Sequence, residues 1–180
     1  MDKSDFTRLY LESEATLYRV SKSILKNEFD CADAVQGAIL KAFKKLHTLR
    51  EEKYFKTWLC RILIRECYRI LETRKNSVSF EDYLQSEGEP SFEHDEHRDI
   101  GLYTAIMQLS EKHRVVITLH YVEGFKISEI SKMLKLPEGT VKSRLSRAKA
   151  DLRGILQEEE EECDNETQQP NFRQCVPGSV

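Results

Sequence analysis

The chain has 180 residues, of which 33% are charged, only four are proline and seven are glycine, and its formal net charge is −3. So few prolines and glycines argue against a turn-rich β protein. The longest strongly apolar run, VVITLHYV at 115–122, is too short to cross a membrane, and the N-terminus lacks the apolar core of a secretory signal. These features predict an all-α protein located in the cytoplasm.

The net charge conceals four segments of alternating sign. Residues 1–75 and 100–156 are each net +5, whereas residues 76–99 are net −7 and residues 157–180 are net −6. We interpret the basic segments as two small helical domains, the segment 76–99 as an acidic flexible linker, and the segment 157–180 as an acidic tail without fixed structure. Basic blocks of this kind indicate contact with nucleic acid, although charge that simply varies along a surface would give the same pattern.

The first basic segment is predicted to form a bundle of three amphipathic helices. These helices are expected over residues 4–26, 30–48 and 55–74. The third helix carries Arg61, Arg65 and Arg69 at spacings of four, so these side chains form one cationic row along it. Trp58 lies on the apolar stripe of the same helix, which favours core packing over a role in base stacking.

Cysteine and histidine give no clear metal or redox site. The five cysteines include no Cys-x-x-Cys pair and are most simply reduced thiols. His94 and His97 lie in the acidic stretch EHDEHRD, where a metal site is conceivable. A solvated linker is the preferred interpretation, because no apolar framework would hold the ligands in place. We therefore expect no metal and no other cofactor.

The second basic segment has the pattern of a helix-turn-helix domain. A short helix is expected over 100–109, and Ser110 is a suitable N-cap for a helix that ends before Gly124. A helix over 126–134, a tight turn and a basic helix that starts near Pro137 complete the motif.

The basic helix divides into an apolar face and a polar face. At 100° per residue one face carries Val141, Leu145, Ala148 and Leu152, and the opposite side carries Ser143, Ser146, Arg147 and Ala150. Lys142 and Arg144 lie on the two flanks. Small and hydrogen-bonding residues between flanking cations suit a recognition helix in the major groove of DNA. A solvated basic helix of an all-α domain would show much of the same pattern.

Three stretches together resemble a known family. Residues 33–46, DAVQGAILKAFKKL, and residues 54–70, YFKTWLCRILIRECYRI, resemble region 2 of bacterial RNA polymerase sigma factors of the sigma-70 family, extracytoplasmic-function (ECF) group. Residues 109–152, which include GTVKSRL, resemble region 4 of the same group. The resemblance extends over nearly all of residues 5–156, and the three motifs are specific in this order and spacing.

The resemblance implies that domain 1–75 binds the clamp of core RNA polymerase and opens the minus-10 promoter element. It implies that domain 100–156 reads the minus-35 element and sits on the polymerase flap, and that the acidic linker follows channels that nucleic acid otherwise occupies. The implied polymerase contacts are Asp33, Gln36, Leu40 and Phe43, with Lys41 and Lys44 as weaker candidates. The implied minus-10 and strand-opening residues are Lys53, Tyr54, Lys56, Arg61, Arg65 and Arg69. The implied minus-35 residues are Lys142, Ser143, Arg144, Ser146 and Arg147.

Three positions depart from the family pattern. Gly37 stands where an acidic residue is usual, and glycine inside a helix costs about 1 kcal/mol relative to alanine. Arg65 and Arg69 replace the polar amides that often lie near the minus-10 bases, so the base preference at that element does not follow from the family. Lys135 occupies the tight turn at a position where glycine is common.

The function predicted from these observations is that of a sigma factor that directs transcription initiation, in a stress or envelope response, and is often held by an anti-sigma factor. This function involves no enzymatic reaction and no small-molecule substrate, and the sequence shows no phosphate-binding loop, metal cluster or nucleophile motif. The alternative is a stand-alone helix-turn-helix regulator that dimerises through its first domain and binds a palindromic operator.

Overall fold

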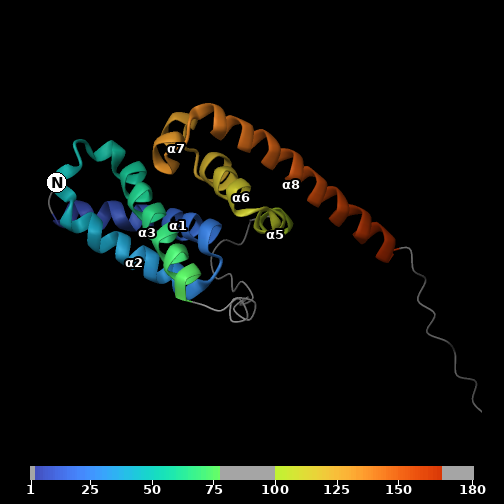
Figure 1. Ribbon diagram of the computed structural model, residues 1–180, viewed down its shortest axis with the longest axis horizontal. Helices are drawn as coiled ribbons and strands as arrows, with labels where there is room; N and C mark the ends of the chain where they lie inside the picture. The colour runs from blue at the N-terminus through green and yellow to red at the C-terminus, as the bar shows by residue number, and fades with distance from the viewer. Residues whose placement is uncertain (1–2, 78–99, 168–180) are drawn as a thin grey trace, which may run out of the picture.

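The computed structural model describes residues 3–77 and 100–167 (Figure 1). Within these two ranges the chain is helical and contains no strand, as the sequence predicts. No helix in the described part is long and apolar enough to span a membrane. Most of the predicted linker, including His94 and His97, and the last 13 residues lie outside the described residues.

The first half is a bundle of three long helices, α1 (Lys3–Leu25), α2 (Glu28–Lys44) and α3 (Phe55–Ser77). Apolar residues at helical spacing meet in its centre, where Leu17, Ala38 and Leu63 are fully buried. Trp58 packs against this core from its edge, which confirms its interpretation as a core residue. The second predicted helix stops at Lys44 rather than residue 48, and the connector to α3 folds into two short 3₁₀ turns, η1 (Leu46–Thr48) and η2 (Glu52–Tyr54).

The second half contains α5 (Ile100–Gln108), α6 (Glu111–Ile117), α7 (Ile127–Leu134) and α8 (Glu138–Thr167). Ser110 is at the N-cap position of α6, as predicted, but its side chain makes no capping hydrogen bond. After Ile117 the chain widens into a single π-helical segment, η3 (Thr118–Val122), in which the Glu123 amide donates to the Thr118 carbonyl at 3.0 Å. The sequence gives no sign of this extra residue in the turn. Gly124 then ends the helix with a φ of 74°, a conformation that glycine adopts without strain.

The helix-turn-helix prediction is confirmed in its geometry. Helix α7 ends at Lys135, whose φ of 55° places it in the left-handed region. That conformation explains why glycine is usual at this position. The Ser131 hydroxyl donates to the Leu136 carbonyl at 2.6 Å and closes the turn, after which α8 begins at Glu138.

One prediction about the C-terminal segment is wrong. Residues 157–180 were expected to lack structure, yet α8 continues without a break to Thr167, and residues 168–180 lie outside the described residues. Glutamate has a high helix propensity, and the run from 158 to 162 contains no glycine or proline that would end a helix already formed. Acidic composition alone therefore did not predict the end of α8, because propagation of an existing helix does not require an apolar face.

The two halves pack directly against each other. Helix α1 lies against α6 and η3, and the N-terminal half of α3 lies against α7 (Figure 1). Their apolar residues form one continuous core that extends from Phe6 to Ala148. The buried Arg114 guanidinium adds a polar link, since it donates to the Ser23 carbonyl of α1 at 2.7 Å and to the Leu109 carbonyl at 2.8 Å.

Glu123 forms the principal ionic contact between the halves. Its side chain is 1% exposed and lies 2.5 Å from Arg19 Nε of α1 and 3.1 Å from Lys56 Nζ of α3. Burial acts to raise the pKa of Glu123, but hydrogen bonds from Arg19 and Thr16 and the nearby Lys56 outweigh it, so the pKa falls below its usual 4.5. The carboxylate is therefore charged at neutral pH and holds two cations of the other half.

We predict that Glu123→Gln lowers the free energy of unfolding at pH 7 by about 2–3 kcal/mol. This is less than the roughly 3–5 kcal/mol for one partner of a fully buried pair, because Arg19 and Lys56 keep some contact with water. A carboxylate with a lowered pKa stabilises the fold above its unfolded-state pKa of about 4.5, and loses this effect as the pH falls through its folded-state pKa. In urea titrations, the difference in free energy of unfolding between the parent and Glu123→Gln should thus shrink below pH 4.5. Glu12→Gln, on the surface of α1, should change the free energy of unfolding little. An equal loss of stability in both variants would contradict the role of Glu123 as the ionic contact between the halves.

Candidate nucleic-acid interface

The outer face of α8 presents the polar and cationic side chains predicted for a recognition helix. Val141, Leu145 and Ala148 are buried against the preceding helices. The side chains of Lys142, Ser143, Ser146 and Arg147 are exposed on the other side. The predicted division into two faces is therefore confirmed, and the polar face of this part of α8 is open to solvent.

Two positions on this helix have neighbours that the sequence did not indicate. The Ser143 hydroxyl donates to the Thr140 carbonyl at 3.0 Å, so it is placed to accept rather than to donate a further hydrogen bond. Arg144 is half-buried beside Tyr68 of α3. Burial and the nearby Glu111 raise the pKa of Tyr68, whereas the Arg144 guanidinium acts in the opposite direction. Arg144 thus faces the seam between the halves in this arrangement.

A second cationic surface lies on α3 and the turn that precedes it. Tyr54 is 48% exposed, and the Lys53 ammonium lies 4.9 Å from the centre of its ring and 2.7 Å from Glu51. Lys56 is held by Glu123 and lies 5.2 Å from the centre of the Phe125 ring. Lys53 and Tyr54 are therefore accessible, while Lys56 is engaged by the second half of the chain.

The predicted arginine row is not uniform. Arg65 is exposed, and Arg69 is exposed but lies 3.1 Å from the Glu66 carboxylate. Arg61 is half-buried, and its Nε has no hydrogen-bond partner among the described residues. A shallow pocket contains Arg65 and Arg69 on one side and Met133 to Lys135 on the other. The turn of the helix-turn-helix therefore borders the row.

The outer face of α2 carries the predicted polymerase contacts together on one side. Asp33 and Gln36 are exposed, Leu40 is 59% exposed and Phe43 is 44% exposed. Phe43 also touches the core through an edge-on contact with Phe6, with 5.5 Å between the ring centres. Phe29, which is 83% exposed, was missed because it precedes the motif by one turn.

Lys41 is held away from this face by Glu66, whose carboxylate lies 2.5 Å from its ammonium. Burial acts to raise the pKa of Glu66, but hydrogen bonds from Lys41 and Arg69 lower it overall. Gly37 lies beside this side chain, and a Cβ at that position would lie 3.4 Å from Glu66 Oε2, which is an ordinary van der Waals contact. The approach of Glu66 therefore does not require the unusual glycine.

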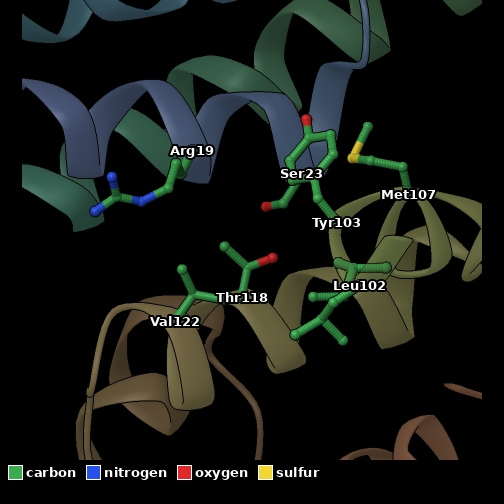
Figure 2. Close-up of a pocket in the computed structure, with 8 residues that line it drawn as sticks. Arg19, Ser23, Leu102, Tyr103, Met107, Thr118 and Val122 are labelled. Atoms are coloured by element: carbon green, nitrogen blue, oxygen red, sulfur yellow. The ribbon is translucent and has the colours of Figure 1, made fainter. Parts of the chain in front are cut away.

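An apolar pocket of about 280 Å³ lies where the two halves meet, between α1, α5 and η3 (Figure 2). Arg19 and Ser23 come from α1, Leu102 and Tyr103 from α5, and Val122 from η3. Burial raises the pKa of Tyr103 to about 12, so its hydroxyl remains protonated. No cluster of His, Cys, Asp and Glu able to hold a metal ion occurs in the described ranges.

Both halves match a family of bacterial transcription proteins. Residues 9–77 match sigma-70 region 2, and residues 100–152 match sigma-70 region 4. The two matched ranges coincide with the three-helix bundle and with the helix-turn-helix half. They also contain every residue of the two cationic surfaces and of the α2 face.

Whole-chain comparisons agree with these matches. RNA polymerase sigma factor SigV of Bacillus subtilis is 31% identical over 73% of this chain and 78% of its own length. ECF RNA polymerase sigma factor SigM of Mycobacterium tuberculosis is 28% identical over 86% of this chain and 79% of its own. Among solved structures, sigma factor RpoE of Bartonella quintana in complex with the anti-sigma factor NepR superposes with a TM-score of 0.75, at 26% identity, over 85% of this chain and 97% of that one. The chain therefore belongs to the sigma-70 family of RNA polymerase sigma factors, in the ECF group.

Proposed function

We propose that this sigma factor acts in the cytoplasm, without enzymatic activity of its own, as a two-domain promoter-specificity subunit. Residues 1–75 would bind the polymerase clamp and open the minus-10 element, and residues 100–156 would read the minus-35 element and contact the flap. The observation that carries this proposal is the exposed cationic face of α8, presented by a helix-turn-helix in the matched region 4.

At the minus-35 element, α8 would enter the major groove with its exposed face. Arg147 points outward from the middle of this face and can donate two hydrogen bonds to the edge of a guanine. Lys142 and Arg144 would meet the phosphates on either wall, and Ser143 and Ser146 would lie at the groove floor. Arg144 would have to leave the side of Tyr68 to do so.

At the minus-10 element, the exposed Tyr54 ring and the cations Lys53, Arg65 and Arg69 would hold an unstacked strand. Arg61 and Lys56 would join them once the second half moves away. Such a movement is required on geometric grounds. The two elements are about 25 base pairs apart, which is roughly 85 Å of duplex at 3.4 Å per base pair, so packed domains could not reach both.

An anti-sigma factor is a further proposed partner. The similar solved structure of RpoE is a complex with the anti-sigma factor NepR. The apolar pocket between α1, α5 and η3 would suit side chains of such a partner, because Leu102 and Val122 on its rim are partly exposed. Separately, the acidic linker 76–99 would enter the polymerase; most of this segment lies outside the described residues.

A stand-alone dimeric regulator is the less favoured function. Such a protein would need only a helix-turn-helix and a dimer contact. This chain also matches region 2 over residues 9–77, and it presents Asp33 and Gln36 on an exposed helix face. These features have a use in a polymerase subunit and none in a simple operator-binding protein.

We predict that Arg147→Ala and Arg144→Ala impair promoter binding in different ways. Loss of a base contact should cost about 1–3 kcal/mol and flatten the preference at one minus-35 base pair. Loss of a phosphate contact should weaken all sequences alike and reduce the salt dependence of binding by about one unit. The measurement is holoenzyme binding to a panel of minus-35 variants at several salt concentrations. Equal weakening of every sequence by Arg147→Ala would contradict the groove-facing assignment.

Run-off transcription with purified core polymerase on a genomic fragment library tests the function itself. The parent chain should produce discrete promoter-dependent transcripts. Replacing both Asp33 and Gln36 with alanine should weaken binding to core polymerase and reduce these transcripts, with helicity unchanged because both side chains are exposed. Binding to an operator fragment without any polymerase, and no transcripts with it, would instead support the regulator.

A further inference from the structure

Phe29 is the most exposed large apolar side chain in the part of the chain that the structure describes, at 83%. It lies in the first turn of α2, whose neighbouring residues Asp30 and Cys31 are buried. An exposed phenylalanine on a helix that is otherwise well packed is unusual, because burial of such a side chain is favourable. Its ring is therefore an apolar group on the surface of α2 that a partner can reach.

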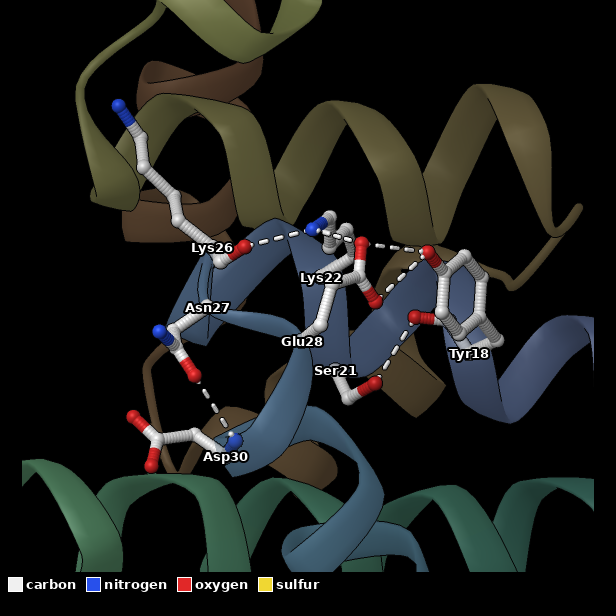
Figure 3. A network of polar contacts seen from close by, with 7 residues as sticks. All are labelled: Tyr18, Ser21, Lys22, Lys26, Asn27, Glu28 and Asp30. Carbon is white, nitrogen blue, oxygen red and sulfur yellow. Dashed lines mark hydrogen bonds and ion pairs between the residues drawn. The ribbon is translucent and has the colours of Figure 1, made fainter. Parts of the chain in front are cut away.

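The exposure does not come from a frayed helix end. The Glu28 carboxylate accepts a hydrogen bond from the Tyr18 hydroxyl at 2.9 Å and pairs with the Lys22 ammonium, which also donates to the Lys26 carbonyl at 2.6 Å (Figure 3). The Asn27 side chain accepts from the Asp30 amide at 3.1 Å and caps the helix. These contacts fix the first turn of α2, so the Phe29 ring is held outward in advance of any binding event.

Phe29 continues the face that carries the proposed polymerase contacts. With 3.6 residues per turn, Phe29, Asp33, Gln36, Leu40 and Phe43 fall within a sector of about 80°. Asp30, Cys31, Ala34, Ala38 and Ala42 are buried on the opposite side. The face extends roughly 21 Å along the helix, with apolar side chains at both ends and polar ones in the middle.

We propose that Phe29 is an apolar anchor for core RNA polymerase that extends the Asp33–Gln36 contact surface by one turn toward the start of α2. The inference rests on the proposed function. The occupant is the polymerase rather than a second copy of this chain, because a face of roughly 200–300 Å² is far below the roughly 800 Å² per partner of a stable dimer. A polymerase subunit can use so small a patch, since other surfaces of the same chain bind at the same time.

The test is a titration of the fluorescently labelled full chain with purified core polymerase. Phe29→Ala should weaken binding about tenfold or more, as expected for an aromatic anchor, and Phe29→Leu should retain most of the affinity. Leu11→Ala, which removes an exposed apolar side chain of α1, is the matched control and should bind like the parent. Circular dichroism should show equal helicity in all variants.

The double Asp33→Ala, Gln36→Ala variant separates the two proposals. If it weakens binding while Phe29→Ala binds like the parent, Phe29 lies outside the interface and this inference is wrong, although the proposed function stands. If neither affects binding, the whole α2 face is misassigned. Light scattering after gel filtration tests whether a second copy of this chain binds the α2 face instead of polymerase. A dimer that Phe29→Ala converts to a monomer, with unchanged affinity for polymerase, would overturn the proposal in favour of self-association.

Discussion

The arrangement of this sigma factor depends on one buried carboxylate. Glu123 stands at the end of the π-helical segment η3 and reaches Arg19 and Lys56 in the other half of the molecule. The π turn matters because it adds a residue just before Glu123 and Gly124, where the chain reverses toward α7. Phosphates or polymerase residues can compete with Glu123 for Arg19 and Lys56, and opening the junction also requires the apolar contacts between the halves to separate.

Much of the fold could be predicted from the sequence because the helices are amphipathic and carry clear end signals. The apolar spacing in α2 and α3, the tight turn after α7 and the start of α8 after Pro137 all agree with the structure. Features that depend on context were not predictable. The π turn at Thr118–Val122 leaves no mark on hydrophobic periodicity, and the continuation of α8 to Thr167 reflects helix propagation rather than burial. The direct packing of the two halves joins segments far apart in sequence and is invisible to local patterns.

The candidate site was likewise predictable from the sequence only in part. The exposed face of α8 followed from helical geometry, and Asp33 and Gln36, which the family resemblance implied as polymerase contacts, are exposed as well. Which lysines are free did not follow, because this depends on partners distant in the chain: Glu123 for Lys56 and Glu66 for Lys41. Of the predicted strand-opening residues, Lys56 is held by the second half, Arg69 pairs with Glu66 on its own helix, and Tyr54 and Arg65 are exposed. Phe29 escaped notice because a single aromatic residue in a first turn resembles an ordinary core residue until its exposure is measured.

The central claim is that the two halves pack around Glu123 in the free chain and separate on the promoter. The most direct measurement is the distance between labels introduced at Glu14 of α1 and Gln157 of α8, two exposed positions outside the proposed interfaces. Single-molecule energy transfer would follow this distance in the free chain, in holoenzyme and in the holoenzyme–promoter complex. The account predicts one short distance in the free chain and a long distance on the promoter, with Glu123→Gln shifting the free chain toward longer distances. A single unchanged distance in all three states would contradict it.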